Sequence, residues 1–338
     1  MSFSRRTLIK ATGIAAAACT APLKLAYGQS AEFTFKYANN QPPVHPMNVR
    51  AKQAVDAIKA ETNGRLDIQI FPSNQLGSDT DTLSQLRSGG VEMFNLSGLI
   101  LSTLVTPAAL NGLGFAFSDY NAVWKAMDGD VGAYIRAQIA KVNLVALDKI
   151  WDNGFRQITT STKPINTPDD LRGFKIRVPV SPMWTSMFKA FDSAPASINA
   201  SEMYTALQTK VVDGQENPLV VVESARFYEV QKFCSMTDHI WGGFWIVASG
   251  KTFPKLPADV QEIVSRQINA AALVQRQQVI DLNASLEPSL TAHGITFNKV
   301  DRSLFRTDLQ SKGFYSQWKE KYGAEAWSLL EQYAGQLS

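Results

Sequence analysis

The sequence predicts an α/β protein with two lobes, joined by strands that cross between them and spanned by one long helix. Three observations predict this fold class. Strand and helix patterns alternate over most of the chain, two strand patterns follow one another without a helix near residue 153, and the pattern is almost wholly helical from Pro257 onward. The 338 residues, of which 45% are hydrophobic, are enough for two packed cores.

The first elements alternate between strand and helix. Phe33, Phe35 and Tyr37 alternate with other residues in "EFTFKYAN", which is typical of a half-buried strand. A helical pattern follows in "NVRAKQAVDAIKAETNG" and ends at Gly64. The segments "RLDIQIFP", "SDTDTLSQLRSGG" and "VEMFNLS" then indicate a strand, a helix and a strand. This alternation predicts a mostly parallel sheet with helices on its faces.

The same alternation continues along the chain. The segment "NAVWKAMDGDVGAYIRAQIAKVN" has a helical pattern that Gly129 and Gly132 are expected to interrupt. Strands are predicted in "LVALDKIW", "GFRQITTS", "FKIRVP", "APASI", "VQKFCSMT" and "GFWIVASG". Thr167 and Pro168 begin a short helix as its N-cap and first helical residue. Longer helices are predicted around Trp184 and in "SEMYTALQTKVVDG".

Two strand patterns meet without an intervening helix in "DKIWDNGFR", where we place the boundary between the lobes. A second crossing is expected near "DHIWGGFW". The predicted division has an export signal in residues 1–30, one lobe in 31–153 plus 241–281, and the other lobe in 154–240 plus 282–338. Continuous strands at such crossings would form a hinge, because residues at the ends of elements absorb the rotation of closure.

The N-terminus has the pattern of an export signal. Arg5 and Arg6 precede an alanine-rich apolar stretch, and Ser-Arg-Arg-x-Leu resembles a twin-arginine signal; a basic, frayed N-terminus is the alternative. After residue 30 no apolar run approaches the roughly 20 residues that a membrane helix needs. The rest of the chain carries nearly equal numbers of acidic and basic side chains, which argues against a nucleic-acid partner. We therefore expect a periplasmic protein that is not inserted in the membrane.

The sequence offers little support for catalysis. His45, His239 and His293 lie far apart and lack zinc-ligand spacing. No nucleophile elbow, phosphate-binding loop or dinucleotide fingerprint is present. Asp79 and Asp81 lie at a predicted helix start, where carboxylates stabilise the helix dipole. We expect a protein that is not an enzyme and that needs no cofactor or metal.

Two arginines on predicted strands indicate a binding site for an anion. Arg156 and Arg177 lie about 20 residues apart, and Arg177 comes shortly before the end of its strand. Ligands of open α/β sheets bind at the carboxyl ends of strands, and a guanidinium matches a carboxylate with two parallel hydrogen bonds. Spacing alone does not distinguish this role from an ion pair with an internal acid.

Four aromatic residues near the predicted crossings could form the apolar walls of such a site: Trp151, Trp184, Trp241 and Phe244. Each of them taken singly is more typical of a core residue.

Two long segments resemble the DctP-type solute-binding proteins of tripartite ATP-independent periplasmic (TRAP) transporters. They are "IFPSNQLGSDTDTLSQLRSGGVEMF" and "INTPDDLRGFKIRVPVSPMWTSMFKAFDSAPASINASEMYTALQTKVVDGQENPLVVVESARFYEVQKF". The resemblance covers most of the chain after the signal. It implies a two-lobed periplasmic-binding-protein fold of type II, hinged by crossing strands. It also implies a membrane permease, with small and large subunits, as the partner.

The resemblance implies roles for individual residues. Arg177 in "KIRVP" matches the arginine that pairs with the solute carboxylate, Arg156 in "GFRQ" a second polar contact, and Asn217 in "GQENP" an amide that fixes the carboxylate. Ala200 stands where some relatives have an aromatic residue, which leaves extra room. Further polar residues are expected at or beside the cleft: Ser97, Asn39, His45, Gln75 and Asp79.

The expected function is capture of a small organic acid in the periplasm and its delivery to a TRAP permease. A sugar acid, a hydroxy acid or an aromatic carboxylate is the expected solute. Two alternatives stay open from the sequence: an exported sensor that presents the ligand to a membrane receptor kinase, and a periplasmic enzyme on the same scaffold.

Overall fold

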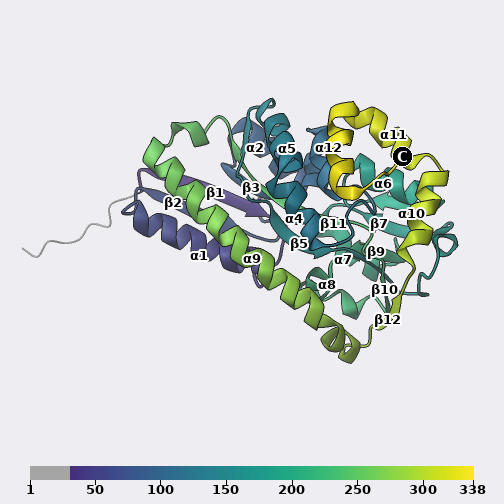
Figure 1. Ribbon diagram of the computed structural model, residues 1–338. Coiled ribbons are helices and arrows are strands. Elements are labelled where there is room, and N and C mark those ends of the chain that lie inside the picture. Colours follow the sequence, from purple (N-terminus) through teal and green to yellow (C-terminus); the bar gives the residue numbers. More distant parts are fainter. Residues whose placement is uncertain (1–30) are drawn as a thin grey trace, which may run out of the picture. The chain divides into compact units, whose positions relative to one another are not determined.

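The computed structural model describes residues 31–338, which contain two six-stranded sheets (Figure 1). The expected export signal in residues 1–30 lies outside the described residues. These two sheets, with helices between most of their strands, confirm the expected fold class of a two-lobed α/β protein.

The first sheet is built from the N-terminal half of the chain and one returning strand. Its order is β2 (Leu66–Phe71), β1 (Phe33–Asn39), β3 (Met93–Ser97), β11 (Trp241–Ser249) and β4 (Leu144–Ala146), and β5 (Trp151–Phe155) also pairs with β11. The alternation in β1 is real, because Phe35 and Tyr37 are buried while Thr34 and Lys36 are less so.

The second sheet holds the strands that follow. Its order is β12 (Thr296–Lys299), β10 (Phe233–Met236), β6 (Gln157–Thr160), β9 (Gly214–Asn217), β7 (Lys175–Val178) and β8 (Ala194–Ser197). Strand β9 lies between β6 and β7, so it brings together the two segments that carry the arginines.

The expectation of a mostly parallel sheet is confirmed, because every strand of the first sheet except β11, and every strand of the second sheet except β6, runs in the same direction as the others of its sheet. Strands β1, β2 and β3 run parallel, but β11 is antiparallel to β3, β4 and β5. In the second sheet β6 is antiparallel to both β9 and β10. Strands β6 and β11 each come directly after a crossing of the chain from one sheet to the other. Each of them runs antiparallel to its neighbours in the sheet that it joins.

Helices separate most of the strands. Gly129 ends one helix and precedes another, as predicted, but the expectation is wrong for Gly132, which lies within the second of these helices. The α-helices are α1 (Pro46–Glu61), α2 (Asp79–Ser88), α3 (Gly98–Leu101), α4 (Tyr120–Asp128), α5 (Asp130–Ala140), α6 (Pro182–Ala190), α7 (Ala200–Gln208), α8 (Leu219–Ser224), α9 (Ala258–Ala292), α10 (Arg302–Ser311), α11 (Phe314–Tyr322) and α12 (Ala324–Ala334). Short 3₁₀ helices lie at Thr106–Gly112, Pro168–Leu171, Phe227–Glu229 and Phe253–Lys255.

The chain passes between the sheets at both places where the sequence predicted a crossing. Strand β5 belongs to the first sheet and β6 to the second, and only Arg156 separates them. Residues 237–240 connect β10 back to β11. The expected residue limits of the two lobes stay a prediction. Helix α12, which we assigned to the second lobe, packs against α4 and α5, which we assigned to the first.

The 35-residue helix α9 runs along both sheets, from α1 to α8 (Figure 1). It also fixes the crossing strand. The Gln275 side chain accepts a hydrogen bond from the Asp152 amide (2.9 Å) and donates one to the Asp152 carbonyl (2.6 Å). Asn283 accepts a bond from the Val220 amide (3.0 Å) at the start of α8. The helix therefore holds β5 and α8 in place beside the first crossing.

Gly154 in β5 is a sensitive position of this crossing. Its φ is +101°, and a Cβ there would lie 2.5 Å from Nδ2 of Asn283. The Asn283 side chain cannot easily move away, because both its amide oxygen and its amide nitrogen form hydrogen bonds. Gly64 has a φ of +77° and open space around it, so Gly64→Ala adds backbone strain alone. We expect Gly154→Ala to lower the free energy of unfolding by roughly 1–3 kcal/mol more than Gly64→Ala does. Urea denaturation of both variants measures this, and equal midpoints would contradict it.

Candidate ligand-binding site

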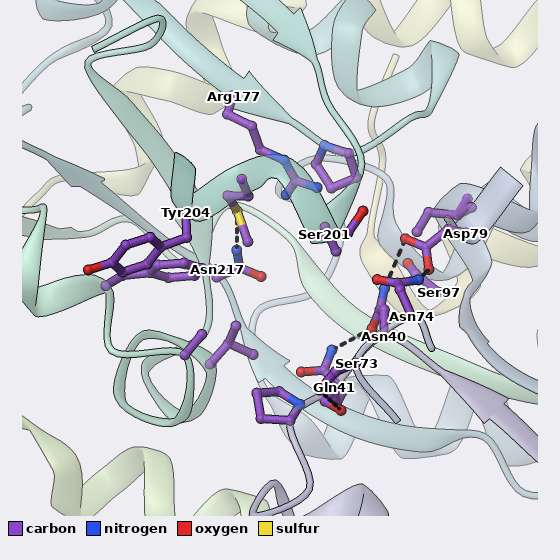
Figure 2. Close-up of a pocket in the computed structure, with 18 of the residues that line it drawn as sticks. Asn40, Gln41, Ser73, Asn74, Asp79, Ser97, Arg177, Ser201, Tyr204 and Asn217 are labelled. Atoms are coloured by element: carbon purple, nitrogen blue, oxygen red, sulfur yellow. Dashed lines mark hydrogen bonds between the residues drawn. The ribbon is translucent and has the colours of Figure 1, made fainter. Parts of the chain in front are cut away.

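A cavity of about 280 Å³ lies among residues from both sheets (Figure 2). In the first sheet, polar lining residues lie just after β1 and β2 and at the end of β3. In the second sheet, they lie near the ends of β7 and β9. This is the strand edge at which open α/β sheets bind ligands. The lining residues are Asn40, Gln41, Pro42, Ser73, Asn74, Asp79, Ser97, Ile100, Arg156, Arg177, Pro179, Trp184, Ala200, Ser201, Met203, Tyr204, Asn217, Val221, Ala225, Phe227 and Phe244.

Arg177 projects from β7 into this cavity (Figure 2). Its side chain is 2% exposed, and its Nε donates a hydrogen bond to the Ile198 carbonyl (2.9 Å). Within residues 31–338, no carboxylate lies within ion-pair distance of this guanidinium. Burial lowers the pKa of Arg177 to about 10, although Glu216 and Asp79 oppose that effect. The guanidinium therefore remains charged at neutral pH and has donors to spare for an anion.

Arg156 is charged as well, but it has an internal partner. Its guanidinium binds the Glu216 carboxylate through Nε and through Nη2 (2.9 Å), and Nη2 also donates to Oδ1 of Asn217 (2.9 Å). The guanidinium lies 4.7 Å from the centroid of the Trp184 ring, within range of a cation–π contact. Of the two arginines that the sequence could not distinguish, Arg156 forms the internal ion pair and Arg177 does not.

Glu216 is fully buried on β9 and also contacts Nε2 of His239 (3.1 Å). Burial alone would raise the pKa of Glu216, but the charge of Arg156 and the hydrogen bonds from His239 and Arg156 outweigh it and hold that pKa below its ordinary value. Burial lowers the pKa of His239, so its ring is neutral at neutral pH. The carboxylate thus neutralises Arg156 and leaves the charge of Arg177 for the cavity.

Asp79 brings a carboxyl group to the same cavity. It is the first residue of α2 and is 1% exposed. One carboxylate oxygen accepts a hydrogen bond from Asn40 (3.0 Å) and the other accepts one from Asn74 (3.0 Å). Burial raises the pKa of Asp79, which these two amides and the charge of Arg177 only partly oppose. A carboxylate acceptor of this kind suits a solute that carries hydroxyl groups, because each hydroxyl can donate a hydrogen bond to it.

Seven of the twelve residues expected at the site line the cavity. They are Arg177, Arg156, Asn217, Ser97, Asp79, Trp184 and Phe244. Ala200 also lines it, at the position where extra room was expected. The aspartate and arginine side chains of the cavity therefore come from residues that the sequence singled out, as do Trp184 and Phe244, whereas other apolar lining residues such as Ile100, Met203 and Phe227 do not.

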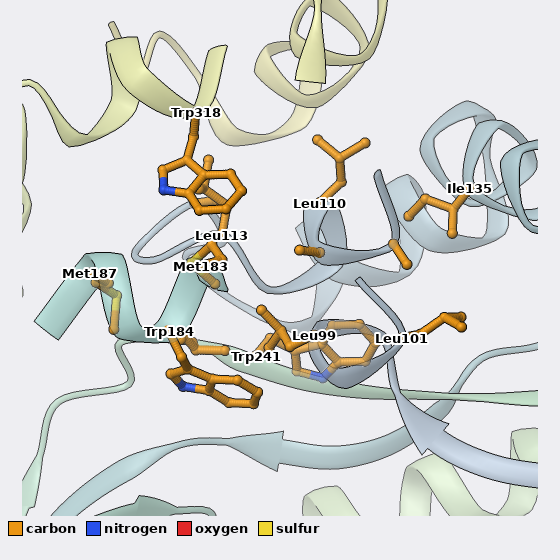
Figure 3. Close-up of a cluster of buried hydrophobic side chains, with 14 of the residues drawn as sticks. Leu99, Leu101, Leu110, Leu113, Ile135, Met183, Trp184, Met187, Trp241 and Trp318 are labelled. Atoms are coloured by element: carbon orange, nitrogen blue, oxygen red, sulfur yellow. The ribbon is translucent and has the colours of Figure 1, made fainter. Parts of the chain in front are cut away.

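Two tryptophans expected as walls lie in the core instead. Trp151 is fully buried and packs with residues of β1, α1 and α9. Trp241 belongs to the cluster shown in Figure 3, where its Nε1 donates to Oδ1 of Asp152 (2.7 Å). Trp184 belongs to the same cluster, so its ring serves both the core and the cavity wall. Trp151 and Trp241 do not line the cavity, because both side chains are buried in the core clusters.

Three expected polar residues support the site or lie outside it. Asn39 and Asn48 bond each other (2.6 and 3.1 Å), and the Asn39 side chain also accepts from the Gln41 amide. His45 caps the N-terminus of α1 by accepting a hydrogen bond from the Met47 amide (3.2 Å). Gln75 is exposed and does not line the cavity. Asn39 and His45 therefore hold the loop that presents the lining residues after β1.

Sequence reasoning missed several polar lining residues. They are Asn40, Gln41, Ser73, Asn74, Ser201 and Tyr204. Four of these come directly after β1 or β2, so the rule that ligands bind at carboxyl ends of strands could have identified them. Ser201 and Tyr204 lie on α7, whose pattern gave no such signal.

The family model of the bacterial extracellular solute-binding proteins, family 7 (DctP), matches residues 37–319. The chain belongs to this family. A solute-binding protein of Roseobacter denitrificans is 30% identical to this DctP protein over 301 residues, which cover 89% of this chain and 92% of the relative.

Two solved structures of TRAP periplasmic solute-binding proteins have the same fold. The protein from Polaromonas sp. JS666, bound to D-erythronate, is 28% identical with a TM-score of 0.84 and covers 90% of this chain and 98% of its own. The protein from Sulfurospirillum deleyianum, bound to succinate, is 27% identical with a TM-score of 0.83 and covers 90% and 99%.

No helix in the part of this DctP protein from residue 31 to residue 338 combines the length and the apolar content that a membrane span requires, and this includes α9.

Proposed function

We propose that this DctP protein captures a hydroxylated monocarboxylate in the periplasm and delivers it to a TRAP permease. The observation that carries the proposal is the buried guanidinium of Arg177, which faces the cavity and has no carboxylate partner among residues 31–338. Burial of a charge without a partner is costly. An anionic ligand relieves that cost, so the site favours a solute with a carboxylate.

The rest of the cavity supports a small solute that carries hydroxyl groups. A volume of about 280 Å³ suits a molecule with few carbon atoms, near the lower end of the roughly 300–1,000 Å³ typical of ligand pockets. Asp79, Ser97 and Ser201 offer acceptors and donors for hydroxyls, and Trp184 and Phe244 supply apolar surface. A sugar acid or hydroxy acid uses both kinds of surface.

The comparisons support a small organic acid as the solute. The Polaromonas relative binds a four-carbon sugar acid and the Sulfurospirillum relative a four-carbon dicarboxylate. The comparisons give no support to the alternative of a solute sensor. The proposed partner is the TRAP permease with its small and large membrane subunits, and the proposed export route is the twin-arginine pathway, because Arg5 and Arg6 precede the apolar stretch.

Thermal unfolding with candidate acids tests the proposed function. We expect D-erythronate or D-galactonate to raise the melting temperature, because a ligand at 100 times its Kd stabilises the folded form by about 2.7 kcal/mol. Erythritol and galactitol have the same carbon skeletons without the carboxylate and should have no effect. If no carboxylate raises the melting temperature, or if the polyols act as strongly as the acids, the proposal is wrong.

A further inference from the structure

We propose that Asp79 acts as a charge filter, which admits hydroxylated monocarboxylates and excludes dicarboxylates. This inference rests on the proposed function, since it assumes that Arg177 holds one carboxylate. Figure 2 shows that Arg177, from β7, and Asp79, from α2, both extend into the cavity. A solute held at Arg177 therefore shares the cavity with Asp79.

The hydrogen bonds of Asp79 show that both of its carboxylate oxygens act as acceptors. Nδ2 of Asn40 donates to one oxygen and Nδ2 of Asn74 to the other. The orientation of the Asn40 amide is fixed in turn, because its Oδ1 accepts a bond from Nε2 of Gln41 (2.9 Å). An ionised carboxylate has about four acceptor positions, so Asp79 keeps acceptors for a solute hydroxyl.

The partners of Asp79 orient its charge without cancelling it. Asn40 and Asn74 are neutral, and no Lys, Arg or His of residues 31–338 lies within ion-pair distance of Asp79. Arg156 contributes no spare positive charge, because Glu216 pairs with it. A monocarboxylate therefore balances Arg177, whereas the second carboxylate of a diacid meets a buried like charge.

Discrimination follows from these contacts. A hydroxyl near Asp79 donates a hydrogen bond to a charged acceptor, which is stronger than a bond between neutral groups. A carboxylate at the same place has no proton to donate and is repelled in a site shielded from water. Like charges placed opposite each other across a binding site cost several kcal/mol, and the filter depends on this cost.

Calorimetry with matched acids tests the filter. D-galactonate and galactarate share six carbons and the same hydroxyl-bearing chain, and galactarate has a second carboxylate; D-erythronate and meso-tartrate form the corresponding four-carbon pair. We expect the unaltered protein to prefer the monocarboxylate of the pair it binds by about tenfold or more. Asp79→Asn keeps the shape and removes the charge, so it should reduce this preference about tenfold by weakening the monocarboxylate and strengthening the dicarboxylate.

Asp81→Asn is the matched control on the same helix. Asp81 completes the capping box with Ser78 and does not line the cavity, so this variant should lose stability and keep the preference. An unchanged preference in Asp79→Asn would overturn the filter. Equal affinity of the unaltered protein for both acids of a pair would overturn it without any variant, while leaving the proposed function intact. Failure of every acid to bind would instead overturn the proposed function.

Discussion

Arg177→Met is expected to weaken the binding of a monocarboxylate by roughly 100-fold or more, because a guanidinium makes two charge-assisted bonds worth about 1.5–3 kcal/mol each. Arg177→Lys should lose less affinity, since it keeps the charge and loses the planar fork. Both values come from isothermal titration calorimetry with the acid that gives the largest thermal shift.

The melting temperature of the ligand-free protein distinguishes a loss of affinity in Arg177→Met from misfolding of the variant. The Arg177 side chain is buried and has only one hydrogen bond, to a backbone carbonyl, so its replacement by an apolar chain of similar length should not lower the melting temperature of the ligand-free protein. Arg172→Met is the control, because Arg172 is exposed and pairs with Asp169 on the surface. Full affinity in Arg177→Met, or an equal loss in Arg172→Met, would contradict the role of Arg177.

Glu216→Gln is expected to cost about 3 kcal/mol or more of unfolding free energy, because it leaves the buried Arg156 without its counter-charge. Urea denaturation measures this as a lower midpoint. Glu61→Gln is the control, since Glu61 pairs with Arg266 at the surface and should change stability by about 1 kcal/mol at most. If the two variants lose the same stability, Arg156 does not depend on Glu216.

The pH dependence of stability gives a second readout for Glu216. Its pKa is lower in the folded than in the unfolded protein, so its contribution is present above the unfolded pKa and is lost as the pH falls through the folded pKa. The unaltered protein should therefore lose stability in acid more steeply than Glu216→Gln. Parallel profiles of stability against pH would contradict the depressed pKa.

Local patterns in the sequence were enough to predict most elements and both crossings. The alternation in β1 and the glycine at residue 129 are local signals, and the structure follows them. The mostly parallel direction of the strands was predicted, but the single antiparallel strand of the first sheet was not, because the direction of β11 depends on where the chain re-enters that sheet, far from its neighbour β3 in sequence.

Contacts between distant residues explain what the sequence could not decide at the site. Arg156 and Arg177 lie in similar strand patterns, and only the pairing of β6 with β9 brings Glu216 to Arg156, 60 residues away. Trp151, Trp241 and Trp184 are the same residue type and all lie near the predicted crossings. Whether each ring faces the core or the cavity depends on the packing of other elements. Residue type indicated which side chains could act, and the fold decided which of them face the cavity.

A crystal structure of the protein grown with D-galactonate, or with the acid that gives the largest thermal shift, tests the central claim most directly. We predict a carboxylate within hydrogen-bond distance of both terminal nitrogens of Arg177, with Arg156 still paired to Glu216. An acid bound elsewhere, with Arg177 turned to Asp79 or Glu216, would contradict the account.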